Sequence, residues 1–126
     1  MIDADWNRKP GQGTHATLSR FDMHNTLIAS GPDFRRGATN ELPSGNVDLA
    51  PTILQILGVP ASQQMDGRVL FEAMSGSTNE RPIPETTTIE AGREFPSGKW
   101  HQSLQVSRVG STIYLDEGNG GFTGRK

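Results

Sequence analysis

The chain has 126 residues and a mass of 13.7 kDa, enough for one domain of ordinary size but not for two. Hydrophobic residues make up 33%, and 15 glycines with 8 prolines indicate many loops around a modest core. The net charge of −2 disfavours a nucleic-acid partner bound by charge, and the absence of cysteine excludes disulfides, iron–sulfur clusters and thiolate zinc sites.

The first 30 residues contain three expected features. Residues 1–14 carry glycine, proline and asparagine without an apolar period, which predicts a loop. Ser19, followed three positions later by Asp22, is typical of a helix start. The short apolar run Thr26–Ser30 ends at Gly31-Pro32 and predicts a strand buried on both faces. No stretch approaches the ~20 apolar residues of a membrane span, and the N-terminus does not resemble a signal peptide.

The middle of the chain predicts its clearest helix. Asp48 suits the N-cap and Gly58 the residue that ends the helix, with Pro51 tolerated in the first turn. Leu49, Ile53, Ile56 and Leu57 share one face at helical spacing, so we expect this face to be buried. A second, shorter helix is expected after Asp66, with Leu70, Ala73 and Met74 on one face and Gly76 beyond its end.

The period of the apolar residues then changes from 3.6 to 2. Lys99–Asp116 predicts a β-hairpin with a two-residue turn at Gly110-Ser111, and Thr86–Glu90 predicts a third strand. The expected organisation is a core segment over residues 1–76, a linker over 77–84 and a hairpin tail over 85–118. Residues 119–126 are expected to be disordered.

Three histidines, His15, His24 and His101, are candidates for chemistry. Catalytic zinc needs at least three protein ligands, and no His-x-x-x-His pattern supplies them, so composition alone makes His15 an ordinary loop histidine. Asp22 could orient an imidazole from the second coordination shell, or it could simply cap the helix that begins at Ser19.

Two further charged positions have structural explanations beside the functional ones. Asp33 follows Gly31-Pro32 and suits a turn better than a ligand site. Arg35-Arg36 could contact an anionic group, but paired arginines on a loop are usually solvated.

Two stretches of the chain resemble a known enzyme superfamily. The run from Gly13 to Phe34, with Gly13-Thr14-His15 at its start and Gly31-Pro32-Asp33-Phe34 at its end, resembles the last metal-ligand segment of type I phosphodiesterases and nucleotide pyrophosphatases. These enzymes belong to the alkaline phosphatase superfamily. Asn46–Leu54, Leu57-Gly58 and Asp66–Leu70 resemble the C-terminal region of the same superfamily, sulfatases included. The resemblance covers roughly residues 10 to 74.

This resemblance implies a fold and a reaction. The fold class is α/β, a C-terminal fragment of an alkaline-phosphatase-like three-layer fold that ends in an antiparallel β-hairpin. Two divalent ions, usually zinc, flank the phosphorus in such enzymes, and His15 matches one metal ligand. Ala16 departs from the family's pattern, which has glycine there. No segment of this chain matches the nucleophile or the remaining ligands, so no catalytic residue is assigned.

The resulting hypothesis is the C-terminal part of a metal-dependent phosphodiester or nucleotide pyrophosphate hydrolase that is inactive alone. The complete enzyme would bind a phosphate-ester substrate. A truncated gene would explain one ligand without its partners. The alternatives are a non-catalytic remnant that binds a partner through the edge of its sheet, or one half of a split hydrolase whose N-terminal half is a separate chain. Family members are commonly exported, but the sequence predicts no compartment.

Overall fold

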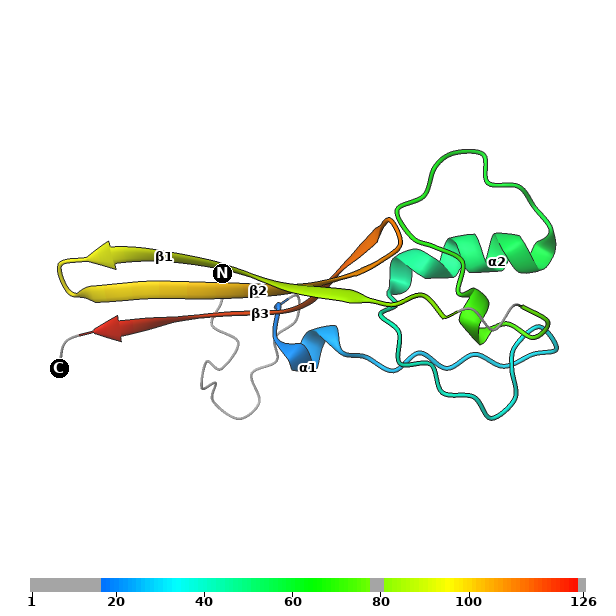
Figure 1. The fold of residues 1–126 in the computed structure, drawn as a ribbon, viewed down its shortest axis with the longest axis horizontal. Helices are drawn as coiled ribbons and strands as arrows, with labels where there is room; N and C mark the ends of the chain where they lie inside the picture. Colours follow the sequence, from blue (N-terminus) through cyan, green and yellow to red (C-terminus); the bar gives the residue numbers. More distant parts are fainter. Residues whose placement is uncertain (1–16, 78–80, 125–126) are drawn as a thin grey trace, which may run out of the picture. The chain divides into compact units, whose positions relative to one another are not determined.

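A computed structural model describes residues 17–77 and 81–124 of the chain. The elements run in the order α1 (Arg20–Met23), η1 (Asn46–Asp48), α2 (Leu49–Leu57), η2 (Phe71–Ala73), β1 (Glu85–Phe95), β2 (Gly98–Val109) and β3 (Thr112–Gly124), as Figure 1 shows. The chain divides into two compact units. Of the described residues, the strand unit contains 17–26, 86–107 and 115–124, and the helix unit contains 27–77, 81–85 and 108–114. No helix of the described part is long and apolar enough to cross a membrane.

The three strands form one antiparallel sheet in the order β1-β2-β3 (Figure 1). The predicted hairpin is confirmed, and Gly110 in its turn has φ 60°, which favours glycine. The predicted third strand is confirmed and is longer than expected, since β1 begins at Glu85 and ends at Phe95. The disorder expected for residues 119–126 is wrong as far as Gly124, because β3 continues to that residue. The domain boundaries remain a prediction.

The helix start predicted at Ser19 is confirmed. Ser19 is the N-cap of α1, and its side-chain oxygen accepts the N–H of Phe21 at 3.3 Å. Just before the helix, the carbonyl oxygen of Leu18 accepts the N–H of Gly118 at 2.7 Å. This bond ties the start of α1 to strand β3 within the strand unit.

The strand predicted over Thr26–Ser30 is wrong. These residues have no regular secondary structure, and Leu27 and Ile28 are 49% and 85% exposed. An apolar run becomes a buried strand only where neighbouring strands satisfy its backbone hydrogen bonds. The sheet in the described part of the chain contains only β1, β2 and β3, so this segment has no strand to pair with.

Helix α2 has the predicted limits, but a different face of the helix is buried. It begins at Leu49, and Gly58 ends it in the left-handed conformation with φ 63°. The face predicted to be buried is instead largely open, because Ile53 and Leu57 are 53% and 66% exposed. The buried residue of the helix is Thr52, whose Oγ1 accepts the N–H of Leu70 at 3.1 Å.

The second predicted helix is only the single turn η2, so that prediction is wrong in type and length. Leu70 lies just before this turn and is buried, as its apolar character suggested. With Val109 and Tyr114 it forms the buried hydrophobic core of the described residues, and all three belong to the helix unit. This core is small, and many large apolar side chains of the described residues are exposed.

Candidate functional site

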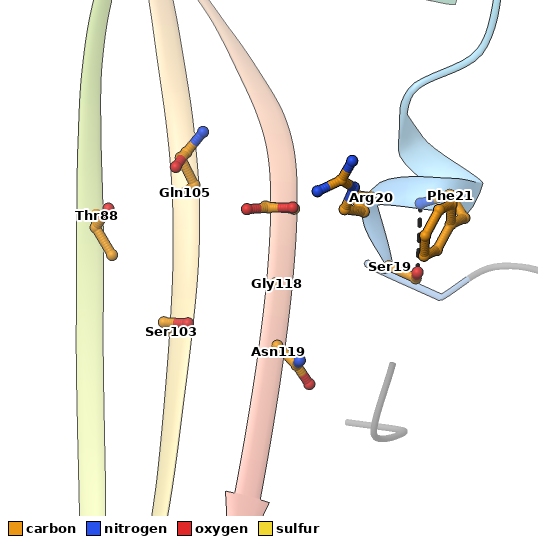
Figure 2. A pocket seen from close by; sticks show the side chains of 9 residues that line it. Ser19, Arg20, Phe21, Thr88, Ser103, Gln105, Gly118 and Asn119 are labelled. Carbon is orange, nitrogen blue, oxygen red and sulfur yellow. Dashed lines mark hydrogen bonds between the residues drawn. The ribbon is translucent and has the colours of Figure 1, made fainter. Parts of the chain in front are cut away.

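A polar pocket of about 240 Å³ lies in the strand unit. Its lining comes from Ser19–Phe21 at the start of α1 and from all three strands, with Thr88 on β1, Ser103 and Gln105 on β2, and Glu117–Asn119 on β3. Figure 2 shows lining residues on the three strands and at the start of α1. The volume corresponds to roughly eight water molecules at about 30 Å³ each.

The pocket exists because α1 approaches β3 closely at Gly118. A Cβ atom at Gly118 would lie 3.1 Å from two side-chain atoms of Leu18, so the missing side chain allows the Leu18–Gly118 hydrogen bond to form. The buried Thr17 donates its hydroxyl to the carboxylate of Asp22. Asp22 therefore holds the chain at the entry to α1.

The chemistry of the lining suits binding. It carries one guanidinium, one carboxylate, two amides and three hydroxyls, and it contains no histidine. The guanidinium of Arg20 lies 5.3 Å from the ring centre of Phe21, a cation–π contact. Both side chains are exposed at the pocket. This mixture of donors and acceptors can hold a small polar molecule.

The second polar cluster centres on Asp48, which is fully buried in the helix unit. Its carboxylate accepts the N–H of Gly45 at 2.9 Å, the N–H of Arg68 at 2.8 Å and the hydroxyl of Tyr114 at 3.0 and 3.1 Å. The sequence predicted Asp48 as the N-cap of α2. It occupies that position, but its side chain does not cap α2, and its hydrogen bonds run to other segments.

Arg68 extends this cluster to Glu72. Its Nε donates to the hydroxyl oxygen of Tyr114 at 3.0 Å, and its terminal nitrogens pair with the Glu72 carboxylate at 2.6 and 2.9 Å. Burial alone would raise the pKa of Glu72, but the hydrogen bonds and charge of Arg68 outweigh it and lower that pKa. Burial also raises the pKa of Tyr114, and with the Asp48 carboxylate it brings the value to about 12 despite the opposing charge of Arg68.

These contacts join the two segments that resemble the C-terminal region of the superfamily. Asp48 and Thr52 belong to Asn46–Leu54, and they accept backbone N–H groups of Arg68 and Leu70 from Asp66–Leu70. Gly67 completes the fit, since a Cβ there would lie 2.0 Å from the carbonyl oxygen of Val47. These residues pack the two segments together, and every buried side-chain polar atom of the described residues has a hydrogen-bond partner.

The structure describes two of the three candidate histidines. His15, the predicted metal ligand, lies outside the described residues. His24 is the exposed C-cap of α1, and His101 is exposed on β2. Among the described residues, no group of three or more histidine, aspartate or glutamate side chains could hold a metal ion.

The structure also describes Asp33, Arg35 and Arg36. Asp33 lies in a turn closed by the bond from Phe34 N–H to the Gly31 carbonyl, as predicted. Arg35 is not simply solvated, because its Nε donates to the Met74 carbonyl at 3.0 Å and a terminal nitrogen donates to Ser77. Arg36 is exposed.

Sequence reasoning missed Arg68, Glu72 and Tyr114. In the helix expected after Asp66, the four-residue spacing of Arg68 and Glu72 would have indicated an ion pair, but the structure forms this pair with Arg68 outside any helix. Tyr114 is 66 residues from Asp48, and no local pattern predicts that contact.

The chain is similar to several curated sulfatases. A putative extracellular sulfatase Sulf-1 homolog of Caenorhabditis elegans is 37% identical over 81 residues, which is 58% of this chain and 11% of that protein. The N-acetylglucosamine-6-sulfatases of Homo sapiens and Bos taurus are 36% and 35% identical over 63 residues, 49% of this chain and 11% of each enzyme. The chain thus spans about a tenth of the length of these relatives. No family model and no solved structure matches the chain.

The matches support the alkaline phosphatase superfamily. They do not support the phosphodiesterase and nucleotide pyrophosphatase branch that the Gly13–Phe34 run resembles, because the matched relatives are sulfatases. The three-stranded antiparallel sheet with its few helices is compatible with an α/β fragment of that superfamily's fold.

Proposed function

We propose that this chain is the C-terminal part of a metal-dependent hydrolase that cleaves an ester of a tetrahedral oxyanion. The observation that carries the proposal is the similarity to sulfatases over about half of the chain. The Asp48 cluster supports it, because it joins the two segments that resemble the superfamily's C-terminal region. The Gly13–Phe34 run favours a phosphate diester, and the names of the relatives favour a sulfate ester.

His15 is the residue that we propose as a metal ligand, to zinc or to another divalent ion. A bound divalent ion would polarise the ester and stabilise the negative charge that develops during cleavage. Among residues 17–77 and 81–124, no group of three or more histidine, aspartate or glutamate side chains could hold a metal ion. On this proposal the remaining ligands and the nucleophile come from another segment. The resemblance assigns them to an N-terminal half, carried in the same protein or in a separate chain.

The test compares the chain alone with the chain joined to that N-terminal half. Reading the DNA around the Met1 codon identifies the half, in frame upstream or in a neighbouring gene. We expect no hydrolysis of aryl phosphodiesters or aryl sulfates by the chain alone, with or without added Zn²⁺, and turnover of one of them by the joined protein.

The two substrates separate the finer proposals. Turnover of the aryl sulfate alone would favour a sulfatase, and turnover of the phosphodiester alone would favour a phosphodiesterase. Turnover by the chain alone that disappears in His15→Ala would show a complete site within these 126 residues and contradict the proposal. Absence of turnover by the joined protein on either substrate would also contradict it.

A non-catalytic interaction module is the second candidate, and one observation favours it. Every residue of β1 is exposed, and β1 lies at one edge of the sheet, where its outer backbone groups are available to a further strand. A clean ribosome-binding site before Met1, with no coding sequence for the other half anywhere in the genome, would favour this candidate.

A further inference from the structure

Helix α2 presents its apolar side outward. At helical spacing, Leu49, Ile53, Ile56 and Leu57 fall within an arc of about 100°, the width of an ordinary core-facing stripe. We call these four residues the α2 apolar face. Three of them are 38%, 53% and 66% exposed, whereas the polar Thr52 on the neighbouring side is only 4% exposed. The helix buries its threonine and exposes isoleucine and leucine side chains, so its apolar surface is not covered by the described residues.

The residues next to the helix enlarge this surface. Val47 and Val59, just before and just after α2, are 49% and 48% exposed. The buried hydrophobic core of the described residues consists of Leu70, Val109 and Tyr114, which is a small core for the helix unit that contains all three. We infer that the α2 apolar face is the surface on which the rest of the hydrolase packs, and this inference rests on the proposed function.

The chemistry of α2 favours a protein segment over a membrane as the occupant. The helix sequence Leu49–Leu57 contains no charged residue, and its only polar side chains are Thr52 and Gln55. Helices that lie on membranes carry lysine or arginine along their polar face, which attracts anionic headgroups. The α2 apolar face has no such flank, so it fits an uncharged apolar protein surface.

The size of the face favours the rest of the hydrolase over a second copy of the chain. A nine-residue helix is only about 14 Å long, whereas a stable dimer interface buries about 800 Å² on each partner. Such a short face is stable when it forms part of a larger packing layer. The chain covers 11% of the length of its sulfatase relatives, so in those proteins nearly nine-tenths of the molecule lies outside the matched segment.

The experiment measures how tightly the 126-residue chain binds the N-terminal half that the DNA around Met1 or a neighbouring gene encodes. Ile53→Asp and Leu57→Asp each place a charge within the α2 apolar face. Gln55→Asp is the matched control, because it places the same charge on an exposed position of the same helix outside that face. We expect about a 100-fold or greater loss of affinity in the first two variants and little change in the control. Thermal unfolding of the chain alone should be similar in all three, because each replaced side chain is exposed.

Equal affinity in all variants would overturn the inference, and so would a genome without a coding sequence for the other half. A chain that dimerises alone, with the dimer lost in Ile53→Asp, would show that a second copy covers the face. Failure of the proposed function is distinguishable. In that case the Ile53→Asp complex would be lost as expected, while the wild-type complex would bind no metal and hydrolyse neither ester.

Discussion

Replacing Tyr114 with phenylalanine tests whether the Asp48 cluster stabilises the helix unit. The hydroxyl of Tyr114 donates to the buried carboxylate and accepts from Nε of Arg68 at 3.0 Å, so the substitution removes two hydrogen bonds to charged groups. Each such bond contributes about 1.5–3 kcal/mol, and both charged groups keep other partners. We therefore expect the free energy of unfolding to fall by about 2–4 kcal/mol.

The companion variant is Asp48→Asn, which keeps the shape of the side chain. The N–H groups of Gly45 and Arg68 and the hydroxyl of Tyr114 all donate to the carboxylate. An amide has one acceptor end and one donor end, so at least one buried donor must face another donor. We expect a loss of about 3 kcal/mol or more. A double-mutant cycle with Tyr114→Phe should give a coupling energy of about 1–3 kcal/mol.

The assay is urea unfolding followed by far-ultraviolet circular dichroism, which reports helix α2 of the same unit, with slopes compared between variants to confirm that the same surface is exposed. A change below about 0.5 kcal/mol in Tyr114→Phe, together with a coupling energy near zero, would refute the role of the cluster.

Three other predictions follow from the same unit. Gly67→Ala should destabilise the chain by at least about 2 kcal/mol, because the new Cβ would lie 2.0 Å from the carbonyl oxygen of Val47. Gly45→Ala is the control, because its new Cβ would make only an ordinary contact at 3.6 Å. Urea unfolding measures the free energy of unfolding of both variants. The raised pKa of Tyr114, about 12 when folded against 10.0, predicts that stability falls between pH 10 and 12, and Tyr114→Phe should remove that part of the fall. Because the pKa of Glu72 is lowered, its ion pair should stabilise the chain above about pH 4.5, and this stabilisation should be lost as the pH falls further. Glu72→Gln should therefore lower the free energy of unfolding at pH 7 and make it less dependent on pH in the acid range.

Local patterns predicted the elements whose causes are local. The limits of α2 follow from Asp48 and Gly58, and the hairpin follows from alternating residues around Gly110-Ser111. The strand expected over Thr26–Ser30 failed because a strand needs a neighbour, and no property of Leu27 or Ile28 shows whether one is present. The burial predicted for one face of α2 failed for the same reason. Its apolar stripe predicts that some surface should cover Ile53 and Leu57, but not that this chain supplies it.

The polar sites depend on contacts between residues far apart in the chain, which local sequence patterns do not predict. The local sequence predicts Asp48 as a helix cap, but it does not predict the hydrogen bond from Tyr114, which is far away in the chain. The pocket likewise needs the bond between Leu18 and Gly118, which brings the start of α1 to β3. His15 was found through its motif alone and lies outside the described residues, so its role as a ligand remains a proposal.

Metal content of the joined protein is the most direct test of the central claim that His15 is a metal ligand. The chain, joined to its N-terminal half and loaded with Zn²⁺, would be dialysed and analysed for bound zinc in three forms: wild type, His15→Ala, and His24→Ala as a matched exposed histidine. We expect two zinc ions in the wild type and in His24→Ala, with one lost preferentially in His15→Ala. Retention of both ions and of full activity in His15→Ala would contradict it.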